Sequence, residues 1–240
     1  MTDPWPDPGP GPGAGADGPE GPGPGDLVRA ARAAGVRDAR LLEAMRSTPR
    51  AAFVPAAHRA SAYADVPIPI SHGQVTTQPS LVAMMIAALG LTGSERVLEI
   101  GTGHGFQTAL LARLATYVVS VERWPDMARE ARANLGARGV ANVEVVVGDG
   151  TLGMPARAPY DAVVVCAAFP EVPPPLVRQL RVGGRLVQPI GPGGQEEVEL
   201  YERTAGAHGL LRRGGVVAAR FVRLYGDYGY PATDPFGDAG

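Results

Sequence analysis

The sequence predicts an α/β fold, a doubly wound and mostly parallel seven-stranded sheet with helices on its faces. Two observations support this prediction. Apolar, strand-like runs alternate with helix-like segments between residues 95 and 190, and the first of these runs ends abruptly in a glycine-rich turn. A chain of 240 residues with 45% hydrophobic content is long enough for one such domain with modest additions.

The N-terminal part of the chain is expected to be a tail followed by helices. Sixteen of residues 1–25 are proline or glycine, which predicts a disordered segment. Asp26 is expected to cap a helix over residues 27–34, and Asp38 a second helix that Pro49 ends. Residues 50–78 are expected to be an irregular and functional loop, after which Pro79 opens a helix to about residue 89.

The rest of the chain is expected to form the sheet. The strand predictions are 95–100, 117–122, 143–147, 160–166 and 184–190, and the helix predictions are 105–114, 125–138 and 173–181. Two further runs, Glu197–Arg203 and Val216–Leu224, predict an antiparallel hairpin at the sheet edge. We therefore expect one domain over 26–226, made of an N-terminal helical and loop part (26–94) and a core (95–226), with a C-terminal tail over 227–240.

Composition argues against several classes of function. The net charge of −2 disfavours nucleic-acid binding, and no apolar stretch is long enough to span a membrane. The single cysteine, Cys166, excludes an internal disulfide, and its apolar surroundings predict a small buried core residue. The four histidines show no metal-binding spacing, so no metal is expected. A cytoplasmic monomer is the resulting expectation.

The glycine-rich turn indicates which cofactor the core binds. Glycines stand at 101, 103 and 105, which differs from the G-x-G-x-x-G spacing of dinucleotide sites and disfavours a nicotinamide dehydrogenase. Glu99 would repel a pyrophosphate but attract a cation, so the pattern favours S-adenosylmethionine, which carries a sulfonium and an amino group. Glu122, at the end of the second strand, suits ribose hydroxyls, and Asp149 beside Gly150 suits an adenine amino group. The alternatives are a plain tight turn, a helix-capping Glu122 and an ordinary turn at Asp149.

Several longer motifs lie outside this generic turn. They are Phe53-Val54-Pro55, residues 62–70, His72-Gly73-Gln74-Val75-Thr76-Thr77-Gln78-Pro79, residues 97–106, Val121-Glu122-Arg123, residues 147–150, residues 158–162, residues 183–187 and residues 221–226. With these motifs the chain resembles the protein-L-isoaspartate O-methyltransferase family over about three quarters of its length. The resemblance implies S-adenosylmethionine-dependent methylation of the α-carboxylate of L-isoaspartyl residues in damaged proteins or peptides, leaving S-adenosylhomocysteine. The methyl ester then closes to a succinimide, and the net effect is repair.

The resemblance also implies site residues. Thr77 stands where the family's active-site loop carries serine, so it is the candidate catalytic residue, with Thr76 as a second hydroxyl in the same loop. Alternatively, Thr77 helps to cap the helix that Pro79 opens. The cofactor-binding candidates are Thr76, Thr77, Gln78, Glu99, Gly101, Thr102, Gly103, Gly105, Glu122, Arg123, Asp149 and Gly150.

The expected chemistry needs few groups from the protein. A carboxylate nucleophile is already ionised at neutral pH, so no strong general base is required, which agrees with the lack of a Ser-His-Asp set. Two other functions remain open from the sequence. One is a peptide-tailoring relative that methylates an aspartate of a ribosomally made peptide to form succinimide or isoaspartate. The other is a non-catalytic S-adenosylmethionine-binding protein.

Overall fold

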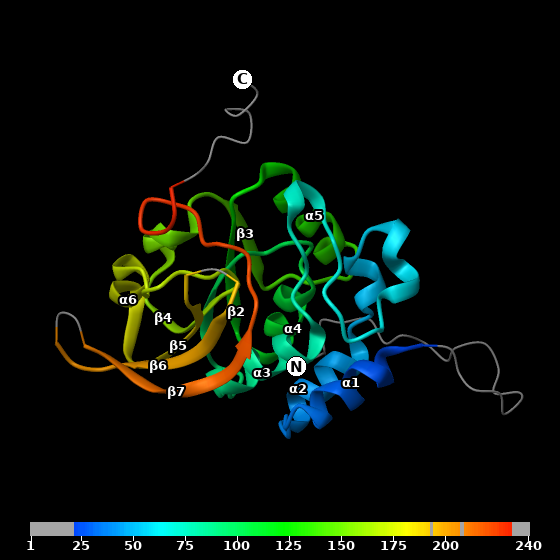
Figure 1. The fold of residues 1–240 in the computed structure, drawn as a ribbon, viewed down its shortest axis with the longest axis horizontal. Helices are drawn as coiled ribbons and strands as arrows, with labels where there is room; N and C mark the ends of the chain where they lie inside the picture. The colour runs from blue at the N-terminus through cyan, green and yellow to red at the C-terminus, as the bar shows by residue number, and fades with distance from the viewer. Residues whose placement is uncertain (1–21, 193, 207–208, 232–240) are drawn as a thin grey trace, which may run out of the picture.

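The computed structural model describes residues 22–192, 194–206 and 209–231, and these form one seven-stranded sheet in the order β3-β2-β1-β4-β5-β6-β7 (Figure 1). The strands are β1 (Arg96–Ile100), β2 (Tyr117–Glu122), β3 (Val143–Val147), β4 (Tyr160–Val165), β5 (Leu180–Ile190), β6 (Glu196–Arg203) and β7 (Leu210–Ala219). Strands β1 to β5 pair in parallel, whereas β6 and β7 add an antiparallel hairpin at the edge. The predicted fold class is therefore confirmed.

The helices of the described chain are α1 (Pro24–Ala33), α2 (Ala39–Ser47), α3 (Pro79–Leu89), α4 (Phe106–Leu114), α5 (Pro125–Gly136) and α6 (Pro174–Gln179). Helices α3, α4 and α5 pack on one face of the sheet. Helices α1 and α2 form an outer layer against α3 and α4, at the lower right of Figure 1. The other face carries only α6 and short 3₁₀ turns among the described residues, so the coverage of the two faces is unequal.

The central strands are mostly apolar because both of their faces are buried. Val97 and Val164 belong to the core under α3 and α4, whereas Leu98 and Val163 belong to the core on the α6 face. Successive side chains of a strand point to opposite faces, so a continuous valine-rich run fills both cores at once. This packing holds the carboxyl ends of β1, β2 and β4 in place, and the polar residues of the site lie at these ends.

The N-terminal helix begins earlier than the sequence predicted. Helix α1 starts at Pro24, with Gly23 as its N-cap, so Asp26 is not the cap but lies inside the first turn. The Asp26 carboxylate accepts a hydrogen bond from the Gly23 N–H at 2.8 Å. The expected tail is thus too long by residues 22–25, and residues 1–21 lie outside the described part. The Asp38 cap of α2 is confirmed, because its carboxylate accepts from the N–H groups of Arg40 and Leu41.

The second edge strand also differs from its prediction. Strand β7 begins at Leu210, six residues before the expected start, and ends at Ala219 instead of Leu224. Directly after β6, the Thr204 N–H donates to the Gly209 carbonyl at 2.7 Å. Strand β7 therefore begins to pair with β6 at Leu210, opposite Arg203. Opposite charges of Arg212 and Glu199 then meet across the hairpin at 2.9 Å.

After β7 the chain leaves the sheet edge and crosses the carboxyl ends of the strands. We call residues 220–231 the strap. Leu224 and Ala168 are joined by a backbone hydrogen bond of 2.8 Å, and the strap continues to Asp149. Residues 227–231, expected to be a tail, therefore belong to the fold, and residues 232–240 lie outside the described part. None of the described helices has the length and apolar character that crossing a bilayer requires.

Candidate active site

A cavity lies at the carboxyl ends of β1, β2 and β4, where the strand order reverses between β1 and β4. Parallel sheets bind their ligands at this position. We call it the central cavity; it measures about 980 Å³ including its open mouth. The loop 70–77 and the strap form part of its walls. A side groove adjoins it between α3 and the end of β7. The two hollows share the wall formed by Val75, Thr76, Thr77, Cys166 and Val222.

The predicted glycine turn forms the floor of the central cavity. Gly101, Gly103 and Gly105 all have positive φ angles, between 56° and 96°, a conformation that residues with a Cβ seldom adopt. A Cβ on Gly101 would also lie 3.2 Å from the Cβ of Cys166. The turn therefore keeps its backbone open to a ligand, and α4 begins directly after it at Phe106. The predicted strand, turn and helix are all confirmed here.

Glu99 does not line the cavity as expected, because it is fully buried beneath the glycine turn. Its carboxylate accepts hydrogen bonds from the Ser120 and Thr108 hydroxyls, both at 2.6 Å, and from the Gln107 amide at 3.0 Å. Burial raises the pKa of Glu99 to about 7, although these three bonds act in the opposite direction. Glu99 thus supports the turn from below.

Glu122 lies where the sequence placed it, in the wall of the central cavity at the end of β2. Its carboxylate accepts from the Gly103 N–H at 2.9 Å and from the Trp124 N–H at 3.1 Å. Burial raises the pKa of Glu122, while these backbone bonds and Arg123 oppose the shift. The lining residue Thr102 is less available, because its hydroxyl bonds the Ser120 hydroxyl at 2.6 Å. A carboxylate anchored to the glycine turn in this way fits a ribose diol.

Arg123 and Trp124 form the outer side of the cavity. The Arg123 guanidinium lies 4.8 Å from the centre of the Trp124 ring and 4.9 Å from that of Tyr225 in the strap. On the loop 70–77, His72 stacks on Trp124 at 3.9 Å, and its Nε2 lies 2.9 Å from the Asp126 carboxylate. Aromatic contacts therefore connect both closing segments to the start of α5.

Asp149 takes a different role in the structure from the expected contact with an adenine amino group. One carboxylate oxygen accepts from the Thr151 N–H and hydroxyl at 2.8 and 2.7 Å, and the other accepts from the Asp227 N–H at 2.7 Å. The Asp149 carboxylate thus holds the strap in place, while the neighbouring Gly150 lines the cavity. A Cβ on Gly226 would lie 2.0 Å from this carboxylate, so the strap can approach so closely only with glycine there.

Thr76 and Thr77, which are neighbours in the loop 70–77, have different surroundings. The Thr76 hydroxyl accepts from the Arg50 guanidinium and from the Ile68 N–H, both at 3.0 Å, so it holds the loop together. Thr77 is only partly buried, lines both hollows and has no hydrogen-bond partner for its hydroxyl among the described residues. The Gln78 side chain turns away from the cavity to Asp65, at 2.8 Å. Thr77 is therefore the available hydroxyl, whereas the Thr76 hydroxyl and the Gln78 side chain already have partners within the protein.

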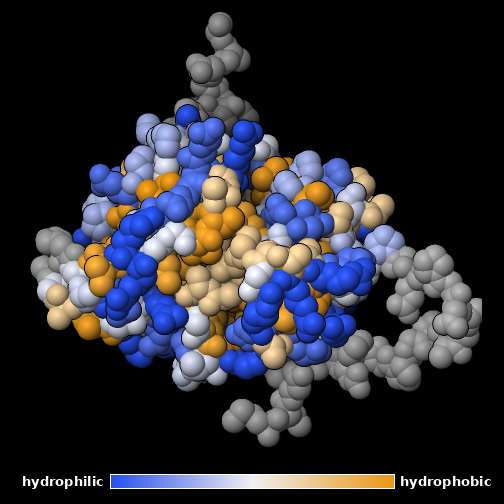
Figure 2. Space-filling view, turned by 60° about the horizontal axis from the view of Figure 1, so that its bottom comes forward, coloured by the Kyte–Doolittle hydropathy of each residue, from blue (hydrophilic) through white to orange (hydrophobic). Residues whose placement is uncertain are grey.

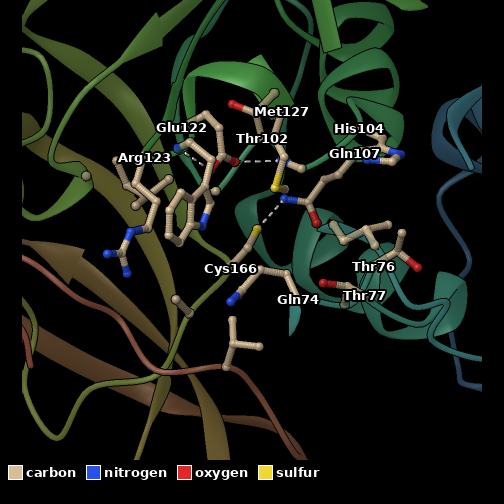
Figure 3. Close-up of a pocket in the computed structure, with 18 of the residues that line it drawn as sticks. Gln74, Thr76, Thr77, Thr102, His104, Gln107, Glu122, Arg123, Met127 and Cys166 are labelled. Atoms are coloured by element: carbon tan, nitrogen blue, oxygen red, sulfur yellow. Dashed lines mark hydrogen bonds between the residues drawn. The ribbon is translucent and has the colours of Figure 1, made fainter. Parts of the chain in front are cut away.

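Cys166 lies in the shared wall and not in the core interior that the sequence predicted. It directly follows β4, is half-buried and lines both hollows, and its sulfur accepts from the Gln107 amide at 2.9 Å (Figure 3). Burial raises the pKa of its thiol, which favours the protonated form at neutral pH. Figure 3 shows Thr76 and Thr77 on one side of Gln107 and Cys166, with Glu122 and Arg123 on the other.

Two polar atoms of the cavity lining fit the expected cofactor. The Trp124 indole N–H and the Gln107 carbonyl oxygen are buried and have no hydrogen-bond partner among the residues that the structure describes. Because the Gln107 amide N–H₂ donates to Glu99 and Cys166, its carbonyl oxygen is left free to accept. An amino-acid moiety that carries both donors and acceptors would match these atoms, and Glu122 would match a nucleoside. The residues present therefore fit S-adenosylmethionine.

Sequence reasoning missed Gln107, Trp124 and Arg50. The available signals were a polar residue in the otherwise apolar start of α4, an aromatic residue after Glu122 and an arginine before a long loop. Within the described residues, no group of three His, Cys, Asp or Glu side chains could hold a metal ion. His208 lies outside the described part.

Comparisons with known proteins agree with this geometry. Residues 24–229 match the model of the protein-L-isoaspartate(D-aspartate) O-methyltransferase family. A protein-L-isoaspartate O-methyltransferase of Methanoculleus marisnigri is 51% identical over 199 residues, covering 83% of this chain and 89% of the relative. One of Anaeromyxobacter dehalogenans is 52% identical over 192 residues, covering 79% of this chain and 91% of the relative.

Solved structures give the same result for the fold. A protein-L-isoaspartate O-methyltransferase structure superimposes with a TM-score of 0.75 at 29% identity, covering 86% of this chain and 67% of that one. A Plasmodium falciparum structure described with the same activity, in complex with S-adenosylhomocysteine, superimposes with a TM-score of 0.72 at 20% identity, covering 86% and 99%. With its family model, its relatives and its fold in agreement, this chain belongs to the protein-L-isoaspartate(D-aspartate) O-methyltransferase family.

Proposed function

We propose that this protein methylates the α-carboxylate of L-isoaspartyl residues in damaged proteins or peptides, the step that leads through a succinimide to repair. The observation that carries the proposal is the meeting of two hollows at Thr77. One has a glycine turn and an acid suited to a nucleoside, and the other is an open groove suited to a peptide. Family membership supports the same reaction. The peptide-tailoring and non-catalytic alternatives have no supporting observation here.

The residues perform this reaction mainly by positioning. When bound, S-adenosylmethionine supplies a methyl group activated by a positively charged sulfur, which gives S-adenosylhomocysteine after transfer. Glu122 would hold the ribose hydroxyls, and the glycine turn would support the rest of the cofactor. The Thr77 hydroxyl would donate a hydrogen bond to one oxygen of the substrate carboxylate and so direct its other oxygen toward the central cavity. No proton has to leave the nucleophile, so Thr77 needs no partner base.

The test compares two peptides that differ only in one linkage. We expect methyl transfer to the isoaspartyl peptide and none to the matched aspartyl peptide. Equal labelling of both would contradict repair and favour the tailoring activity, and cofactor binding without labelling of either would favour the non-catalytic alternative. The proposal includes a cytoplasmic monomer; the cytoplasmic part is consistent with a single cysteine, which can form no internal disulfide. Gel filtration and cell fractionation check these two points.

A further inference from the structure

The side groove has an apolar lining. Its walls include Pro67, Leu81 and Met84 on one side and Val217 and Phe221 on the other. Figure 2 turns toward the viewer the face that carries α3 and β7 in Figure 1, and an apolar stretch crosses the middle of this face between polar borders. Thr77 belongs to the wall that the groove shares with the central cavity, so a peptide methylated there would place the residues next to its isoaspartyl group along these walls.

Arg220 is the only charged side chain among the described residues that line this groove. It is exposed, and no hydrogen bond or ion pair joins its guanidinium to another described residue. Two arginines of the adjacent strand behave differently, because Arg212 pairs with Glu199 at 2.9 Å and Arg213 with Glu202 at 2.8 Å. Arg220 thus keeps its donors available for a ligand.

Glu196 and Asp65 form no ion pair with Arg220. Glu196 is buried, and one of its oxygens accepts from the N–H of Phe221, the residue next to Arg220, at 2.9 Å. Asp65 accepts from the Gln78 amide and from the Ser80 N–H at the start of α3, both at 2.8 Å. Neither carboxylate lines the groove. Arg220 is thus the charged side chain at the edge of a largely apolar groove and forms no ion pair with a described residue, so the complementary ligand group is a carboxylate.

We propose that Arg220 makes the enzyme selective for isoaspartyl peptides that carry a second acidic side chain one to three residues from the isoaspartyl residue. The inference rests on the proposed function, because it assigns the groove to the peptide. An exposed ion pair of this kind corresponds to about a fivefold preference in kcat/KM, mostly through KM, at low ionic strength. The preference should weaken as salt screens the pair.

The experiment uses isoaspartyl peptides of one length with glutamate, glutamine or lysine at each of the neighbouring positions. Wild-type protein should prefer glutamate over lysine about fivefold at one or more positions. Arg220→Gln should lose the preference with kcat on the glutamine peptide unchanged, and Arg220→Glu should reverse it. Arg178→Gln is the matched control, since Arg178 is an exposed arginine on α6 outside the groove, and it should keep the wild-type preference.

Two results would overturn the inference: equal kcat/KM for the three peptides with wild-type protein, or a preference that survives in Arg220→Gln. Calorimetric titration of the same peptides into protein with S-adenosylhomocysteine separates the inference from the proposed function. If no isoaspartyl peptide is methylated, the proposed function fails, and the titrations still decide the role of Arg220. Tighter binding of the glutamate peptide by wild type than by Arg220→Gln would support it, and equal affinities would refute it.

Discussion

Replacing Arg50 by methionine should destabilise the protein and loosen the loop that carries Thr77. Arg50 is fully buried, and its guanidinium donates to the carbonyls of Ala62, Ala64 and Val66 at 3.0–3.1 Å and to the Thr76 hydroxyl at 3.0 Å. One side chain therefore gathers a loop with little regular structure of its own. Methionine has a similar length but no donor, so the change removes these bonds and preserves most of the packing.

The size of the effect follows from two opposing contributions. Three carbonyls that lose their charged donor cost roughly 2 kcal/mol each, or about 6 kcal/mol. Against this, burial outweighs the attraction of Asp65 and lowers the pKa of Arg50 from 12.5 to about 10, a net penalty on the charged form of about 3 kcal/mol that methionine does not bear. The expected loss in the free energy of unfolding is therefore about 3 kcal/mol, which lowers Tm by roughly 6–12 °C in a domain of this size.

Urea unfolding followed by circular dichroism measures the stability, and methyl transfer to an isoaspartyl peptide measures the site. Arg50→Met should also raise the peptide KM, because Thr77 follows directly after the anchored Thr76. Arg46→Met is the control; Arg46 is exposed on α2 in a 3.6 Å pair with Glu43 and should change stability by less than about 0.5 kcal/mol. An Arg50→Met protein as stable as the control would refute the reasoning.

Three further predictions concern the central cavity. Thr77→Val should lower kcat/KM about 10- to 100-fold and leave calorimetric affinity for S-adenosylhomocysteine within about twofold, whereas Thr77→Ser should stay near wild type; full turnover in the valine variant would exclude the proposed role. The pKa of Glu99, about 7 when folded and 4.5 as the reference, means that the native state holds more protons between these values. Its contribution to the free energy of unfolding should therefore fall by up to about 3 kcal/mol as pH rises from 4.5 through 7, and denaturant titrations of Glu99→Gln should lack this slope; parallel pH curves for the two proteins would argue against it. Asp149→Ala should weaken S-adenosylhomocysteine binding about tenfold and speed proteolysis within the strap, while Asp227→Ala, which keeps the N–H that Asp149 accepts, should do neither; equal behaviour of the two variants would count against the anchoring role.

The backbone of the site was predictable because it follows from local rules. Apolar strands that end in glycine or an acid place Gly101, Glu122 and Gly150 at one edge of a parallel sheet, whatever the side chains nearby do. The positive φ angles of the turn require residue types that the sequence displays directly. The edge hairpin was less predictable, since the arginine and glycine residues after Leu210 look like a loop until their partners in β6 are known.

The directions of polar side chains were not predictable, because their partners are distant in the sequence. Asp149 turns to the N–H of Asp227, 78 residues away, and Gln78 turns to Asp65. Glu99 lies under the glycine turn because two hydroxyls and an amide donate hydrogen bonds to its carboxylate there. One of these donors, the Ser120 hydroxyl, comes from the neighbouring strand β2. A motif shows which residues stand near a site, whereas the fold decides which of them face the ligand.

The wall shared by the two hollows limits how this protein can change over evolutionary time. Thr77, Cys166 and Val222 each border both the cavity and the groove. A substitution at any of these positions alters the fit of both the cofactor and the peptide. A change in peptide specificity therefore cannot arise there without disturbing the binding of the methyl donor. Positions farther along the trough, such as Met84 and Arg220, border the groove alone. Substitutions that change peptide specificity should therefore accumulate along the part of the side groove away from the shared wall, whereas the residues of the shared wall should change little.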